Sequence, residues 1–98
     1  MTLSKDVNGN ALTISISGRL DTTTAPELET EIKNSIEGVQ DLVIDIKDLD
    51  YISSAGLRVL LSAQKIMNKQ GSMVVKNANE AVMEVFEVTG FTDILTIE

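Results

Sequence analysis

The segment Asp41–Leu61 constrains the fold more than any other part of the chain, because the spacing of its apolar residues changes within it. Leu42, Ile44 and Ile46 stand at every second position, and this period predicts a strand with one face in a core. From Leu57 onward, apolar residues recur every three or four positions, which predicts a helix with one buried face. The sequence therefore predicts a buried strand that leads directly into a helix.

Two adjacent serines, Ser53 and Ser54, lie where this strand meets this helix. Serine is a favourable N-cap, because its hydroxyl accepts a hydrogen bond from a first-turn amide and so stabilises the helix by about 1 kcal/mol. The helix face beside the core stripe carries small and apolar residues, namely Ala55, Gly56, Val59, Ala63 and Ile66. Two interpretations stay open: capping with ordinary packing, and a modifiable serine beside a docking face for another protein.

The N-terminal third of the chain predicts a hairpin followed by a helix. Asn8-Gly9 lies between Leu3–Val7 and the alternating segment Leu12–Ser17, and this dipeptide is typical of a type I′ turn between antiparallel strands. Thr24–Glu27 has the spacing of a capping box, so a helix is expected to begin there and to end at Gly38.

The C-terminal third predicts a strand, a helix and a final strand. Ser72–Lys76 is expected to be a strand, and a helix is expected from Glu80 to Val88, with Asn79 as its cap and Gly90 at its end. A last short strand is expected over Ile94–Ile97. The residues expected to face inward from this helix are Val82, Val85, Phe86 and Thr89.

These elements predict a single α/β domain over residues 1–98. Strands joined through helices are expected to be parallel with right-handed crossovers, whereas the N-terminal β-hairpin is antiparallel. The polar members of the alternating strands are Thr, Ser, Asp and Lys, so one face of the sheet is expected to stay wet. The predicted fold is a mixed, mostly parallel β-sheet with helices packed mainly on its other face.

The composition opposes several classes of partner. Eight basic against fifteen acidic residues give a formal net charge of −7, a sign that disfavours nucleic-acid phosphates and anionic lipid headgroups. No apolar run approaches the roughly 20 residues that span a bilayer, and the first residues lack a signal-peptide apolar region. We therefore expect a cytoplasmic protein with no nucleic-acid partner and no direct membrane insertion. The acidic surface and the lack of a large aromatic patch favour a monomer.

The composition also disfavours an enzyme. With no cysteine and no histidine, the chain lacks thiol chemistry, thiolate metal sites and the usual general base. The serines lack the leading glycine of a nucleophile elbow, and no Gly-Lys-Ser/Thr phosphate loop is present. Four aspartates without the spacing of a calcium loop are interpreted as a solvated rim: Asp21, Asp45, Asp48 and Asp50. We expect no catalytic residue, no metal and no cofactor.

The segment Asp48–Leu57, DLDYISSAGL, resembles the signature of STAS-domain anti-sigma factor antagonists, also called anti-anti-sigma factors. Gly18–Asp21 resembles the Gly-x-Leu-Asp segment that follows the second strand of that family, and the resemblance covers essentially all 98 residues. It implies the STAS fold and phosphorylation of Ser54 by a partner that is both anti-sigma factor and serine kinase. Many members carry aspartate at the position of Ser53, so here Ser53 is an alternative acceptor.

The resemblance also implies a partner switch. The unphosphorylated protein binds the anti-sigma factor and releases the sigma factor, phosphorylation at Ser54 abolishes binding, and a serine phosphatase reverses the modification. The residues expected to bind the partner are Asp21, Ser53, Ser54, Ala55, Gly56, Leu57, Arg58 and Val59. The alternative is a constitutive STAS subunit of a membrane transport complex or of a signalling scaffold.

Overall fold

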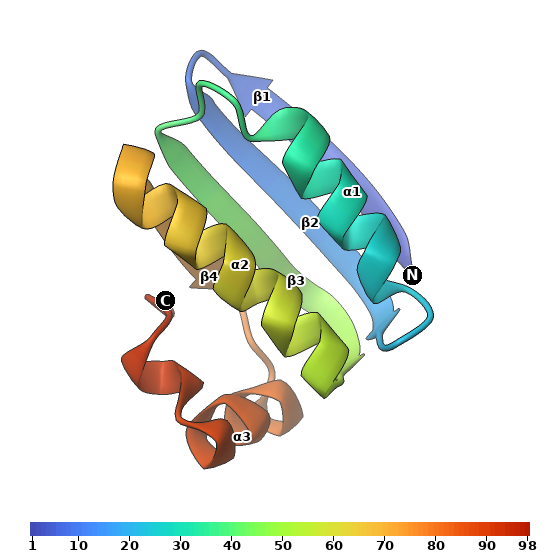
Figure 1. The fold of residues 1–98 in the computed structure, drawn as a ribbon. Coiled ribbons are helices and arrows are strands. Elements are labelled where there is room, and N and C mark those ends of the chain that lie inside the picture. Colours follow the sequence, from blue (N-terminus) through green and yellow to red (C-terminus); the bar gives the residue numbers. More distant parts are fainter.

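The computed structural model describes residues 1–98 and contains one four-stranded sheet in the order β1–β2–β3–β4 (Figure 1). The strands are β1 (Thr2–Asn8), β2 (Ala11–Leu20), β3 (Asp41–Ile52) and β4 (Ser72–Lys76). β1 is antiparallel to β2, whereas the β2–β3 and β3–β4 pairs are parallel. The predicted mixed, mostly parallel sheet and its N-terminal hairpin are confirmed.

Three α-helices and one short 3₁₀ helix accompany the sheet. They are α1 (Ala25–Ser35), α2 (Ser54–Gln70), α3 (Glu80–Thr89) and η1 (Phe91–Asp93). Figure 1 shows α1 and α2 side by side across the same face of the sheet, with α3 below them in this view, where it packs against β3. On β2, Leu12, Ile14 and Ile16 are buried beneath the helices, while Thr13 and Ser15 on the other face are only half-buried. The alternation therefore predicted correctly that one face of the sheet would be covered.

The apolar stripe predicted for the central helix is confirmed in α2. Leu57, Leu60, Gln64 and Met67 are buried, and Leu61 is half-buried. The expectation that the neighbouring small residues lie on the surface is wrong for three of them. Gly56, Val59 and Ala63 are buried, while Ala55 and Ile66 remain half-buried. The small side chains therefore let α2 pack closely against the rest of the fold, including α1.

Gly56 shows how close this packing is. A β-carbon at this position would lie 2.7 Å from Cγ of Leu20 and 2.9 Å from Cγ1 of Ile52. Both neighbours are buried, so neither can move away without disturbing the core. The first turn of α2 consequently lies directly over the ends of β2 and β3.

The hairpin turn differs from the prediction. Asn8 pairs with Ala11, so Gly9 and Asn10 occupy the two central positions. Gly9 has a φ of 63°, whereas Asn10 is not among the residues with positive φ. A type I′ turn needs positive φ at both central positions, so the predicted type I′ turn is wrong; positive φ at the first position alone is typical of type II′.

The predicted capping box at the start of α1 is also wrong. Thr24 is the N-cap residue but makes no capping hydrogen bond; its hydroxyl instead donates to the Arg19 carbonyl oxygen at 2.9 Å. Asp21 organises this turn, because its Oδ1 accepts hydrogen bonds from the Thr23 amide at 3.0 Å, the Thr24 amide at 3.2 Å and the Thr23 hydroxyl at 2.7 Å. The bond from the Thr23 hydroxyl is the largest cause that lowers the pKa of Asp21 below its usual range, because these donors favour the carboxylate.

The C-terminal elements are confirmed in part. α3 begins after Asn79, whose Oδ1 accepts from the Val82 amide at 2.8 Å, and ends at Gly90, which has a φ of 79°. Val82 and Phe86 are buried and Val85 is half-buried, but Thr89 is exposed and donates to the Val85 carbonyl at 2.7 Å. The predicted strand over Ile94–Ile97 is reduced to one parallel bridge between Ile97 and Val75. The expectations for Thr89 and for a full last strand are therefore wrong.

Gly56→Ala tests the close approach of α2 to β2. The added methyl group overpacks the buried contact with Leu20, so we expect a loss of about 1–3 kcal/mol in the free energy of unfolding. Urea unfolding followed by circular dichroism measures this loss. Lys65→Ala, on the exposed side of α2, serves as a control and should change stability by less than about 0.5 kcal/mol. Equal stability of Gly56→Ala and the wild type would contradict the close packing at Gly56.

Asp21→Asn tests the turn before α1. The variant should have a lower urea midpoint at neutral pH, because an uncharged amide accepts these hydrogen bonds less strongly than a carboxylate. Because the pKa of Asp21 is lowered in the folded state, its contribution to stability is present above the usual pKa and is lost as the pH falls through the folded value. The difference in midpoint should therefore shrink below about pH 4. Asp6→Asn, on exposed β1, is the control and should leave the midpoint at neutral pH unchanged. A difference between Asp21→Asn and the wild type that stays constant across pH would refute the role of the carboxylate.

Candidate functional site

The two serines lie at the start of α2, at the carboxyl ends of two parallel strands. Ser53 is the N-cap residue, and its hydroxyl oxygen accepts from the Gly56 amide at 3.4 Å. The Ser53 amide donates to the Leu20 carbonyl oxygen at 2.9 Å, which ties the start of α2 to the end of β2. The position of this helix turn is therefore set by backbone contacts as well as by the packing of Gly56.

Ser54 is the first residue of α2 and differs from its neighbour in its surroundings. Its side chain is exposed and makes no hydrogen bond to the protein, whereas Ser53 is half-buried and is used as the cap. The first turn of a helix presents unpaired amides and the positive end of the helix dipole. An enzyme can therefore reach the Ser54 hydroxyl, and an anion attached there lies in a favourable field.

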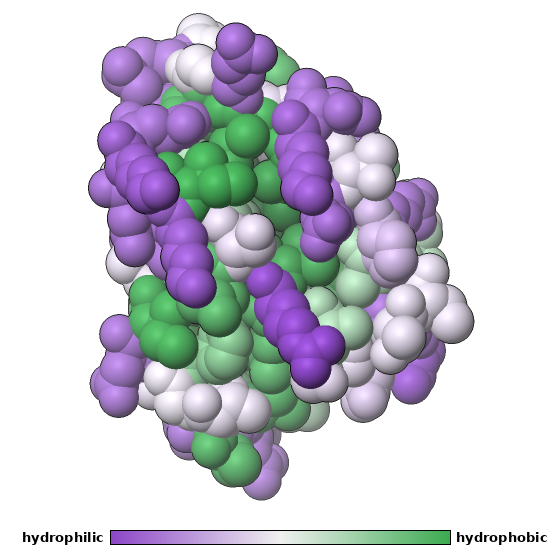
Figure 2. All heavy atoms as spheres, viewed as in Figure 1, coloured by the Kyte–Doolittle hydropathy of each residue, from purple (hydrophilic) through white to green (hydrophobic).

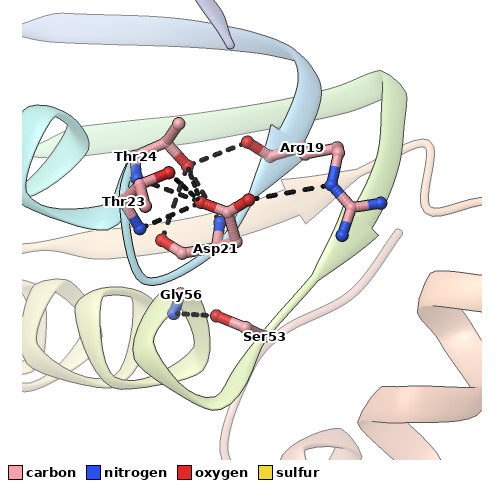
Figure 3. Close-up of polar contacts among 6 residues, drawn as sticks. All are labelled: Arg19, Asp21, Thr23, Thr24, Ser53 and Gly56. Atoms are coloured by element: carbon pink, nitrogen blue, oxygen red, sulfur yellow. Dashed lines mark hydrogen bonds and ion pairs between the residues drawn. The ribbon is translucent and has the colours of Figure 1, made fainter.

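The Asp21 turn lies next to this helix start (Figure 3). The view shows the hydrogen bonds of Asp21 with Thr23 and Thr24 on one side and the Ser53–Gly56 capping bond on the other. Because β2 and β3 are parallel neighbours, their carboxyl ends bring these two turns together. Asp21 and Ser53, 32 positions apart in the sequence, thus belong to one surface.

An exposed arginine and a tyrosine border the same surface, and sequence reasoning missed both. Nε of Arg19 lies 3.7 Å from Oδ2 of Asp21, and its guanidinium carbon lies 4.2 Å from the centre of the Tyr51 ring. Tyr51 is 41% exposed. The pairing of Arg19 with Tyr51 follows from a register shift between Gly18 and Arg19, which the alternation of apolar residues does not reveal.

The structure separates the predicted partner-binding residues into two groups. Ser54 and Arg58 are exposed, and Asp21, Ser53 and Ala55 are half-buried. The remaining three residues, Gly56, Leu57 and Val59, are buried. Members of the first group can touch another protein directly, while the buried residues hold the first two turns of α2 in place.

A shallow groove of about 240 Å³ runs between α1 and α2 beside Ser54. Its lining residues are Thr22, Ala25, Pro26, Glu29, Ala55, Arg58 and Val59. Figure 2 shows apolar side chains along the strip between the two helices, flanked by hydrophilic ones. Because residues of both helices line this groove, it extends the surface around Ser54 toward α1.

A second hollow, of about 170 Å³, lies on the uncovered face of the sheet, and neither Ser53 nor Ser54 lines it. Hydroxyl and charged side chains line it, Asp45 among them. The amide of Asn77 donates to Oδ1 of Asp45 at 3.0 Å, and this bond is the main cause that lowers the pKa of Asp45 below its usual range.

No group of acidic, histidine or cysteine side chains is arranged to hold a metal ion. None of the helices has the length and apolar character needed to cross a membrane.

Comparisons with known proteins agree with this geometry. The anti-sigma-B factor antagonist of Bacillus subtilis (strain 168) is 35% identical over an alignment of 100 positions, which covers 99% of this chain and 92% of that protein. An anti-sigma factor antagonist from Mycobacterium paratuberculosis has a crystal structure that matches with a TM-score of 0.89 and 25% identity, covering 98% of this chain and 83% of that chain.

The Bacillus anti-sigma factor antagonist SpoIIAA has a similar fold in both of its solved forms. The unphosphorylated form matches with a TM-score of 0.79 at 16% identity, over 99% of this chain and 87% of that chain. The phosphorylated form matches with a TM-score of 0.77 at 17% identity, over 99% of this chain and 91% of that chain. The family model of the STAS domain matches residues 2–98, and the chain therefore belongs to the STAS-domain family.

Proposed function

We propose that this protein is an anti-sigma factor antagonist that is switched by phosphorylation of Ser54. The observation that carries the proposal is the exposed, unbonded hydroxyl of Ser54 at the start of α2. In its unphosphorylated form the protein binds an anti-sigma factor that is also its serine kinase, and a sigma factor is released. A serine phosphatase restores the binding form. Because sigma factors act on RNA polymerase, the proposed partners place the protein in the cytoplasm.

Two comparisons support this proposal. A relative that is 35% identical and covers 99% of the chain is named an anti-sigma-B factor antagonist. SpoIIAA, which shares the fold, has been solved both with and without its phosphate. Both forms match this chain with similar TM-scores, which supports a switch that changes the surface rather than the fold.

The acceptor is assigned to Ser54 rather than to Ser53 for a structural reason. The Ser53 side chain is half-buried and its oxygen accepts from the Gly56 amide, so a kinase has less access to it than to the exposed Ser54. The Ser54 hydroxyl can be modified without loss of a contact.

The phosphate acts on binding more than on folding. It adds a charge of about −1.5 to −2 at neutral pH. At a helix N-terminus an anion is stabilised by about 0.3–1 kcal/mol, so the modified domain stays folded. Repulsion from one partner carboxylate at roughly 8 Å, in an effective dielectric of about 40, amounts to about 2 kcal/mol, or about thirtyfold in affinity. Enclosing the doubly charged group in an interface adds a desolvation cost.

The protein contributes a docking surface, and the nucleotide belongs to the kinase. In this proposal Ser54, Ala55 and Arg58 contact the partner from α2, and the Asp21 turn contacts it from the end of β2. The buried residues Gly56, Leu57 and Val59 act by positioning these groups. We assign no catalytic step to the protein, and we propose that it acts as a monomer.

Binding of the cognate anti-sigma factor to variants of Ser54 tests the switch. Ser54→Ala should bind about as tightly as the unmodified wild type, because the variant introduces no charge and keeps a small side chain at the interface. Ser54→Asp should bind at least about fivefold more weakly, since one negative charge gives about half the repulsion of the phosphate. Isothermal titration calorimetry gives these affinities. Equal affinity of the alanine and aspartate variants would contradict the proposal.

Phosphate incorporation by the kinase tests the choice between the two serines. Ser53→Ala should retain incorporation while losing about 1 kcal/mol of stability, because it removes the cap. Ser54→Ala should lose incorporation and keep its stability. Incorporation that disappears only in the Ser53 variant would move the acceptor to Ser53. A protein that carries no phosphate in cells and co-purifies with a transporter would instead favour a constitutive subunit.

A further inference from the structure

Arg58 lies one helical turn after Ser54 on the exposed side of α2. Both side chains are exposed, and residues four apart on a helix are neighbours with β-carbons about 5–6 Å from each other. Arg58 takes part in none of the ion pairs of the structure, which are Lys5–Glu31, Arg19–Asp21 and Lys33–Glu29. An unpaired cation therefore stands within reach of any anion placed on the Ser54 hydroxyl.

We infer that Arg58 binds the phosphate of Ser54 within the same helix and is thereby withdrawn from the partner-binding surface. This inference depends on the proposed phosphorylation of Ser54. An acidic group at position i and a basic group at position i+4 form the more favourable orientation of a helical ion pair. The guanidinium also matches two phosphate oxygens at once, which a lysine cannot do.

No other group is placed to compete strongly for either member of the pair. Glu29 lines the same groove as Arg58, but its carboxylate is bound to Lys33 at 3.1 Å. Asp21 accepts hydrogen bonds from its own turn and faces Arg19. Arg19, the other arginine near the site, is held between Asp21 and the ring of Tyr51. Arg58 is thus the cation next to Ser54 that forms no ion pair in the structure.

Pairing changes the surface in two ways. Before modification, Arg58 offers a positive charge at the edge of the groove beside Ala55 and Val59, where a carboxylate of the partner can bind. After modification, that positive charge is neutralised and a negative charge remains at Ser54. The partner therefore loses an attraction in addition to meeting a repulsion.

Phosphoserine introduced genetically at position 54 tests the pair without any kinase. A ³¹P NMR titration should give a second phosphate pKa that is lower by about 0.2–0.4 unit in the wild-type background than in Arg58→Ala, because the arginine favours the dianion. Arg58→Lys should restore part of the difference. Lys65→Ala is the control, because Lys65 lies on the same side of α2 as Ser54 but about 16 Å from it along the helix axis. Identical titrations of wild type and Arg58→Ala would overturn the inference.

Affinities for the anti-sigma factor test the withdrawal of Arg58. Four proteins are compared, with serine or phosphoserine at position 54 in the wild-type and Arg58→Ala backgrounds. Phosphorylation should weaken binding more in the wild type than in the variant, by a factor of about two to five. An equal or larger loss in the variant would overturn the withdrawal of Arg58. Unchanged binding of the phosphorylated wild type would instead reject the proposed function, whatever the NMR titration shows.

Discussion

The close approach of the first turn of α2 to the end of β2 is the contact on which the rest of the site depends. It requires a residue without a side chain at Gly56, because Leu20 and Ile52 already fill the space where a β-carbon would lie. The hydrogen bond from the Ser53 amide to the Leu20 carbonyl closes the same junction. With the helix held there, Ser54 points into solvent and the Asp21 turn lies beside it.

Two identical side chains have different roles at this junction because the helix begins between them. Ser53 has extended backbone geometry and serves the fold as its cap, whereas Ser54 is the first helical residue and is left free. The fold thus provides a hydroxyl that can be modified at little cost to stability. In the proposed function the partner supplies the chemistry, and this protein supplies the surface.

Much of the fold could be predicted from short-range patterns in the sequence. The errors arise where a contact that the pattern does not reveal determines the local structure. Alternation in β2 and β3 correctly predicted which residues are buried. The capping box failed because the Thr24 hydroxyl donates to the Arg19 carbonyl oxygen, while the Glu27 amide donates to the Thr24 carbonyl oxygen instead of to the hydroxyl. The hairpin turn shifted by one residue so that Gly9 takes the first central position, where φ is positive. The last strand shrank to one bridge because the amides of Ile94 and Leu95 donate to the Phe91 carbonyl oxygen in the turn that follows η1.

The candidate site was predictable to a similar degree. The change of period around Ser53 indicated a helix start, but spacing alone could not show that Val59 and Ala63 are buried, since this depends on long-range packing that includes α1. The Arg19–Tyr51 pair depends on a register shift in the parallel β2–β3 ladder, which leaves no mark in the apolar pattern.

NMR chemical-shift perturbation of the ¹⁵N-labelled protein maps the surface that the anti-sigma factor covers. We expect the partner to perturb amides of the Asp21 turn and of the first two turns of α2, and to spare the uncovered face of the sheet around Asp45. When Ser54 carries phosphate, we expect the partner to perturb neither the Asp21 turn nor α2. A footprint centred on Asp45, or one that persists unchanged after phosphorylation, would contradict this expectation.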